Sequence, residues 1–200
     1  FGAPAGGLRV KAEAQLRAQR SPYSNWEGFF FGLEEEKFDP IKVNFDDGNL
    51  DEGGETELSA SLEVFPDVTV PLEIEMQARV FELGGRARAG KVVKPLYNLD
   101  KAIGVRPLFK KGRAAENSQA LFEIVTLDRE GKPVGTENLQ YTLYEEHWDY
   151  TWFRRSGAWD YEVFIRDEVI REGTLSVSAI SPETINVNVE WGAYRIEVRD

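Results

Sequence analysis

Period-two alternation of apolar and polar residues is the feature that most restricts how this chain can fold. Between Leu72 and Val80, apolar residues alternate with Glu, Gln and Arg. Because successive side chains of a β-strand point to opposite faces, this run predicts a strand with one buried and one wet face. The runs 8–16 and 58–64 alternate in the same way. Gly84-Gly85 predicts a two-residue hairpin turn after the strand over 72–80.

The second half of the chain carries the same signature. Strands are expected at 119–127, 139–146, 148–154, 159–166, 174–178, 185–189 and 194–198, and turns at 128–133, 156–157, 172–173 and 181–182. No helix-length periodic segment separates these strands, which argues against a parallel α/β sheet. We therefore predict an all-β fold of two tandem, antiparallel, immunoglobulin- or fibronectin-III-like β-sandwiches. One would span 1–100 and the other 101–200, with the join near Asn98–Lys101.

Composition excludes several classes of function. The 200 residues carry a formal net charge of −11, which repels nucleic-acid backbones and anionic membrane surfaces. The chain has no cysteine, so disulfides, thiolate metal sites and cysteine nucleophiles are excluded. No apolar run approaches the ~20 residues that span a bilayer, so no direct membrane insertion is expected. The chain begins at Phe1 without a methionine and ends in a strand-like run, so we expect both ends to be cut within a longer protein.

No catalytic residue, metal centre or cofactor is expected. His147 is the only histidine, whereas a zinc site usually needs several nitrogen or sulfur ligands. Glu145 and Glu146 are adjacent on a predicted strand, so they point to opposite faces and cannot flank one glycosidic bond. The run Asp47–Gly53 starts like a calcium loop, but Glu52 replaces the turn glycine and the twelfth position is not glutamate. We interpret it as an acidic loop in water.

Aromatic residues gather between 147 and 162 and predict a contact surface. Its candidate members are Trp148, Tyr150, Trp152, Trp159 and Tyr161. Alternation places the first three on one face, and a turn near 156–157 brings the last two back beside them. In water such a face would be a stacking platform for sugar rings, and covered it would be a core or an inter-domain contact. We favour contact with a neighbouring domain, because large exposed apolar patches usually mark a partner.

Four segments together resemble the bacterial alpha-2-macroglobulin family. Phe1–Gly6 is similar to the opening of a macroglobulin-like domain, and Ile103–Phe109 to the start of the next one. Glu146–Tyr161 resembles the aromatic hairpin of that second domain, and Trp191–Val198 its closing strand. The likeness spans both halves of the chain. It implies two consecutive macroglobulin-like β-sandwiches.

The resemblance implies a part of a mechanical protease trap. In that family a protease cleaves a bait segment, the molecule rearranges, and an internal thioester between Cys and Gln attaches to the attacker. Bacterial members are typically lipid-anchored at the inner membrane and face the periplasm. Because this chain has no cysteine and no segment similar to a bait, those elements are expected outside it. The implied role is a scaffold without enzymatic activity, whose partners are neighbouring macroglobulin-like domains, target proteases met by the parent protein, and cell-wall synthesis machinery.

Two other classes of function stay open at this point. One is a glycan- or peptidoglycan-binding β-sandwich module that uses the five aromatic residues. The other is an adhesin or pilus-type repeat, which also stacks sandwiches. The solvent exposure of Trp148, Trp152 and Trp159 distinguishes a covered aromatic face from an open one.

Overall fold

The computed structural model describes residues 6–62, 66–96, 98–155 and 157–200, which form two compact units whose regular secondary structure consists of strands and one 3-10 turn. Unit 1 comprises Phe1–Pro22 and Gly32–Asp100, and unit 2 comprises Tyr23–Phe31 and Lys101–Asp200. All strand pairs are antiparallel, so the predicted all-β fold is confirmed. None of the described residues lies in a helix that is long and apolar enough to cross a membrane.

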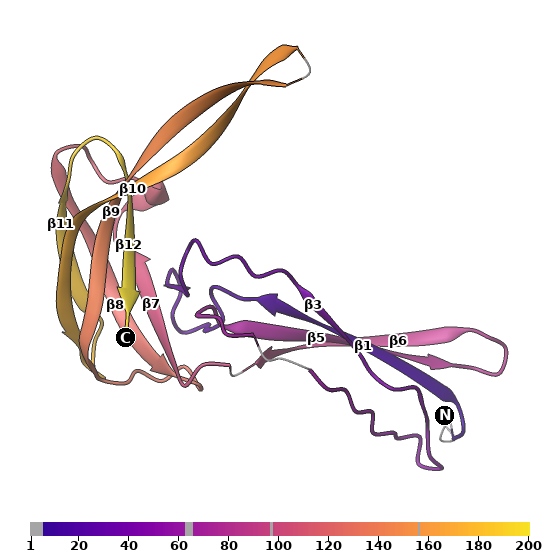
Figure 1. Cartoon of the computed structure of the whole chain (residues 1–200). Helices are drawn as coiled ribbons and strands as arrows, with labels where there is room; N and C mark the ends of the chain where they lie inside the picture. Colours follow the sequence, from indigo (N-terminus) through magenta and orange to yellow (C-terminus); the bar gives the residue numbers. More distant parts are fainter. Residues whose placement is uncertain (1–5, 63–65, 97, 156) are drawn as a thin grey trace. The chain divides into compact units, whose positions relative to one another are not determined.

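The strands of unit 1 form one sheet in the order β3-β1-β5-β6, with β4 also paired to β1 (Figure 1). Their bounds are β1 Arg9–Ala18, β3 Ile41–Asn44, β4 Gly48–Asn49, β5 Leu72–Phe81 and β6 Ala87–Leu96. Leu16 lies opposite Ile74, and Ala14 opposite Met76, so one face of the sheet is apolar. Side chains from outside the strands, such as Phe38, cover this face.

The opposite face of the unit 1 sheet is a ladder of ion pairs. Glu75 on β5 lies 3.0 Å from Arg17 on β1 and 2.9 Å from Lys91 on β6. Arg79 on β5 pairs with Glu13 on β1 at 2.9 Å. The hydrogen bond from Lys91, with the charge of Arg17, lowers the pKa of the Glu75 carboxyl. The predicted wet face of the strand over 72–80 is therefore observed.

Two local predictions in unit 1 differ from the structure. Residues 58–62 form no strand, although Leu62 packs against the core of the unit, and Val64 lies outside the described residues. The β5–β6 turn has three residues rather than two, because the amide of Glu82 donates to the carbonyl of Arg86. Gly85 takes a φ of 79° in this turn, a value that favours glycine.

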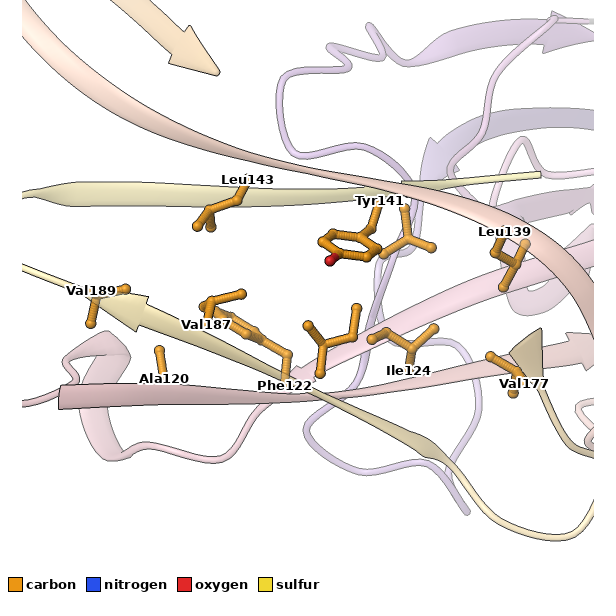
Figure 2. Packing of buried hydrophobic residues seen from close by; sticks show 11 residues of the cluster. Ala120, Phe122, Ile124, Leu139, Tyr141, Leu143, Val177, Val187 and Val189 are labelled. Carbon is orange, nitrogen blue, oxygen red and sulfur yellow. The ribbon is translucent and has the colours of Figure 1, made fainter. Parts of the chain in front are cut away.

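Unit 2 is a sandwich of a four-stranded sheet, β11-β8-β7-β2, and a three-stranded sheet, β10-β9-β12. Its elements are β2 Phe30–Phe31, β7 Lys101–Pro107, a 3-10 turn Lys110–Gly112, β8 Ser118–Asp128, β9 Thr136–Arg155, β10 Ala158–Val177, β11 Glu183–Val189 and β12 Ala193–Arg199. Alternate residues of both sheets meet between them (Figure 2). This core contains Ala120, Phe122, Ile124, Leu139, Tyr141, Leu143, Val177, Ile185, Val187, Val189 and Val198.

Strand β2 reaches unit 2 from the first hundred residues. Phe31 lies opposite Gly104 of β7 and is fully buried. A Cβ at Gly104 would lie 2.6 Å from the Phe31 ring, so the glycine makes room for that ring. The neighbouring Phe29 is also buried, with the Arg106 guanidinium 4.4 Å from the centre of its ring. β2, the seventh strand of this sandwich, thus lies within residues 1–100, the range predicted for the other domain.

β9 and β10 are longer than the sequence pattern predicts. Each runs for 20 residues. The predicted turn at Glu172–Gly173 is wrong, because β10 passes straight through it. Gly173 lies opposite Tyr141, and a Cβ there would be 2.6 Å from the Tyr141 ring. The glycine serves this close approach and not a turn.

Candidate functional site

The distal parts of β9 and β10 form a two-stranded ribbon, here defined as residues 147–166. β12 accompanies β9 only as far as the pair Ala193–Glu146. Beyond that pair, β9 and β10 continue together, with His147 opposite Arg166 and Arg155 opposite Ala158 (Figure 1, orange). Gly157 has a φ of 87° at the tip, and Ser156, the other residue of the predicted turn, lies outside the described residues.

The structure brings the five predicted aromatic residues onto one face of the ribbon. Trp152 lies opposite Tyr161, with ring centroids 5.2 Å apart, and the Tyr150 and Tyr161 rings are 6.1 Å apart. Trp148 and Trp159 continue this face toward the root and the tip. We call it the aromatic face and define it as Trp148, Tyr150, Trp152, Arg154, Trp159, Tyr161, Val163 and Ile165.

Within the described part of unit 2, the aromatic face is open to solvent. The exposed fraction is 63% for Trp152, 70% for Trp159 and 50% for Trp148. Tyr150 and Tyr161 are more than half exposed as well. A sheet face in water usually carries mainly polar residues, whereas this exposed face carries mainly aromatic ones. The sequence predicted the grouping, and the structure adds that no other described residue of unit 2 covers it.

The opposite face of the ribbon is polar. It holds His147, Asp149, Thr151, Phe153, Arg155, Ala158, Asp160, Glu162, Phe164 and Arg166, and seven of these ten residues are polar or charged. Arg166 pairs with Asp149 at 3.3 Å, and His147 Nε2 lies 3.3 Å from Glu168. His147 is thus a strand residue whose ring lies beside one carboxylate. The ribbon is amphipathic, and the two faces differ sharply in character.

A buried arginine fastens the ribbon to the sandwich at its root. Arg195 of β12 has a side chain only 4% exposed. Its Nε lies 3.3 Å from Glu146 of β9, its Nη1 lies 3.2 Å from Glu197 of β12, and its Nη2 donates to Asp167 of β10. Its guanidinium carbon lies 4.8 Å from the centre of the Tyr144 ring. These five residues, the Arg195 cluster, connect all three strands where β12 ends its pairing.

The Arg195 cluster was not found by sequence reasoning. Arg195 alternates with apolar neighbours in β12, which is also what a solvated strand residue would do. Its burial arises because Glu146 and Asp167 are opposite one another in the β9–β10 register. The bulge between Val169 and Arg171 lies beside the cluster, and such bulges bend and re-aim a strand. Unit 2 therefore sets the direction in which the ribbon leaves the sheet.

The remaining candidate residues have structural partners. Asp47, the first residue of the calcium-like run, pairs with Arg9 at 2.5 Å and with Lys11 at 3.5 Å. A hydrogen bond from Arg9 lowers the pKa of the Asp47 carboxyl, which favours its charged form. Asp51 accepts a hydrogen bond from the amide of Glu55 at 2.9 Å. In the part of the chain that the structure describes, no group of three or more His, Asp or Glu side chains could hold a metal ion.

Comparison with known families assigns both halves of the chain. Residues 1–97 match the family described as Bacterial Alpha-2-macroglobulin MG5 domain, and residues 104–200 match Bacterial macroglobulin domain 6. The chain belongs to the bacterial alpha-2-macroglobulin family. The family resemblance seen in the sequence motifs is thereby confirmed.

Curated relatives match over the whole chain. Alpha-2-macroglobulin of Xylella fastidiosa strain 9a5c is 32% identical over 201 residues, which cover 100% of this chain and 12% of the relative. Alpha-2-macroglobulin of Escherichia coli K12 is 29% identical over 219 residues, covering 100% of this chain and 13% of the relative. The chain therefore spans about one eighth of the length of these relatives.

Solved structures of this family contain the same fold. The native conformation of E. coli alpha-2-macroglobulin matches with a TM-score of 0.79 and 28% identity, covering 98% of this chain and 13% of that one. Salmonella alpha-2-macroglobulin reacted with methylamine matches with a TM-score of 0.78 and 29% identity, covering 99% and 14%. The macroglobulin-domain fold of this chain is thus shared with both proteins.

Proposed function

We propose that this chain is a scaffold segment, without enzymatic activity, of an alpha-2-macroglobulin-type endopeptidase inhibitor. The observation that carries the proposal is the match of the whole chain to two family domains within much longer relatives. The buried polar side chains support it, since they are engaged with one another. Thr136 donates to Thr126 at 3.1 Å, and Arg195 pairs with Glu197.

Rigidity is the physical contribution that such domains make to a protease trap. Each unit holds its strands by antiparallel ladders around an apolar core, so it moves as a body when the surrounding protein rearranges. The chain matches E. coli alpha-2-macroglobulin activated by porcine elastase with a TM-score of 0.78 and the trypsin-activated protein with 0.74, against 0.79 for the native conformation. Similar scores in two states are what we expect of domains that keep their fold during activation.

The proposal extends to the whole protein of which this chain spans a part. We propose that the parent faces the periplasm with a lipid anchor in the inner membrane. Bait and thioester elements, where the parent has them, would lie outside these residues, and target proteases would meet the parent there. Neighbouring macroglobulin-like domains would be the direct partners of this segment, and cell-wall synthesis machinery would associate with the parent. The multi-domain relatives support the neighbouring-domain partners. The location, the bait and thioester elements and the cell-wall partner follow from what the family resemblance implies.

A comparison of the full-length protein with the 200-residue chain tests the function. Both are incubated with a panel of endoproteases, and residual cleavage of a large protein substrate and covalent conjugation are measured. We expect the full-length protein to inhibit and the 200-residue chain to have no effect, because a scaffold segment lacks the moving parts. Inhibition, conjugation or hydrolysis by the 200-residue chain itself would contradict the proposal. Fractionation of cells tests the location, with the parent expected in the inner-membrane fraction and accessible from the periplasm.

A further inference from the structure

The aromatic face is too apolar and too long to be an ordinary solvent face. The polar sheet face of unit 1 provides an internal comparison, since its positions hold Glu, Gln, Arg and Lys, and its charged side chains form ion pairs. On the aromatic face, Arg154 is the one charged residue among eight positions. Contiguous apolar patches of this kind mark an interaction site in a soluble protein.

The ribbon also needs support that the described part of unit 2 does not provide. Residues 147–155 pair only with 158–166, over a length of about 30 Å at ~3.3 Å per residue. A two-stranded ribbon is marginally stable by itself in water, and a third layer or strand normally stabilises it. The covering element must therefore come from outside unit 2.

We infer that the aromatic face is covered, in the intact protein, by another domain of the same polypeptide. This deepens the proposed function and rests on it, because it takes the parent to be the long chain of this family. The covering surface would be apolar, with a carboxylate opposite Arg154 near the tip. Trp152, Tyr161 and Trp159 would supply most of the contact area, since rigid aromatic side chains bury much surface at little entropic cost.

Net charge favours a domain of the same polypeptide over a second copy of the chain or an anionic membrane. A second copy of the chain would bring another −11 charges, and an anionic membrane would repel the acidic surface in the same way. The ribbon itself is neutral, because residues 147–166 hold three Arg and three Asp or Glu. A covalently linked domain avoids the long-range repulsion, since the linkage supplies a high effective concentration.

The contacts at the root of the ribbon favour a partner that occupies a fixed position relative to unit 2. Arg195 ties β12 to Glu146 and Asp167, so the ribbon leaves unit 2 in a set direction. A pre-oriented apolar face suits a permanent contact within one protein, because little ordering entropy is lost on docking. Seven eighths of the length of the relatives lies outside this chain and can provide the docking surface.

Site-specific photo-crosslinking in the full-length protein tests the inference. p-Benzoylphenylalanine is placed at Trp152 on the aromatic face and, as the matched control, at Thr151 on the polar face. Both positions are exposed in this chain and adjacent in sequence, but they face opposite sides. We expect position 152 alone to crosslink within one polypeptide, to a peptide from outside unit 2, identified by mass spectrometry. Crosslinks between two copies, or equal crosslinking at both positions, would overturn the inference.

Hydroxyl-radical footprinting of the unsubstituted full-length protein provides a second reading. The oxidation rate of Trp152 is divided by its rate in the urea-denatured protein. If the face is open, the 63% exposure of Trp152 lets its oxidation rate fall at most about twofold below the rate in the denatured protein, whereas a covered face lowers that rate roughly tenfold or more. An open result refutes the inference, and so does protection that appears only when soluble peptidoglycan fragments are added. Protease trapping by the same preparation is measured separately, so a failure of the proposed function is distinguished from a failure of docking.

Discussion

Replacement of Phe31 by alanine tests whether unit 2 depends on a strand from the first hundred residues. Phe31 is fully buried, its ring fills the space beside Gly104, and it lies edge-on to Tyr23 with centroids 4.9 Å apart. Truncation of a buried phenylalanine costs about 3–5 kcal/mol in the free energy of unfolding. With a urea slope of ~2 kcal/mol/M, the unfolding midpoint falls by about 1.5–2.5 M.

Tryptophan fluorescence reports the unfolding of unit 2 without a signal from unit 1. All five tryptophans belong to that unit, Trp26 in the segment 23–31 and the others after residue 147. The matched control is Phe30→Ala, which removes the same side chain from the adjacent position, where it is 55% exposed. We expect the control to change stability by less than about 1 kcal/mol. If Phe31→Ala costs no more than Phe30→Ala, the segment does not complete the sandwich and the reasoning fails.

Three other perturbations have defined outcomes. A fragment of residues 101–200 lacks β2, so we expect it to show no cooperative urea transition, and a sharp transition would contradict this. Arg195→Met leaves carboxylates without their shared counter-ion and should cost about 3–5 kcal/mol by urea denaturation, while Arg199→Met, at a 62% exposed side chain, should cost less than about 1 kcal/mol. The hydrogen bond from Lys91 lowers the pKa of Glu75. The ion pairs of Glu75 therefore stabilise unit 1 at pH values above 4.5, the ordinary pKa of the carboxyl, and this contribution disappears as the pH falls through the lowered pKa. Circular dichroism of Glu75→Gln should therefore show a stability deficit at neutral pH that vanishes in acid, and a deficit independent of pH would argue against the pairing.

The alternation of residues determined the fold class and most strand positions. In β5, Ile74 and Met76 face the core while Glu75 faces the ion-pair ladder, as the pattern predicted, because the side-chain period of a strand is fixed by backbone geometry. The same rule placed Trp148, Tyr150 and Trp152 on one face. These properties depend only on neighbours along the chain and on a hairpin turn.

Contacts between distant segments were decided only by the tertiary structure. Phe31 and Gly104 are 73 positions apart, and no local pattern shows that one fills the space left by the other. The sequence at Gly173 is typical of a turn, but in the structure Gly173 makes room for the ring of Tyr141 on the paired strand. The burial of Arg195 likewise requires β9, β10 and β12 in register. A sequence states which side of a strand each residue occupies, whereas the partner on that side depends on which strands come together in three dimensions.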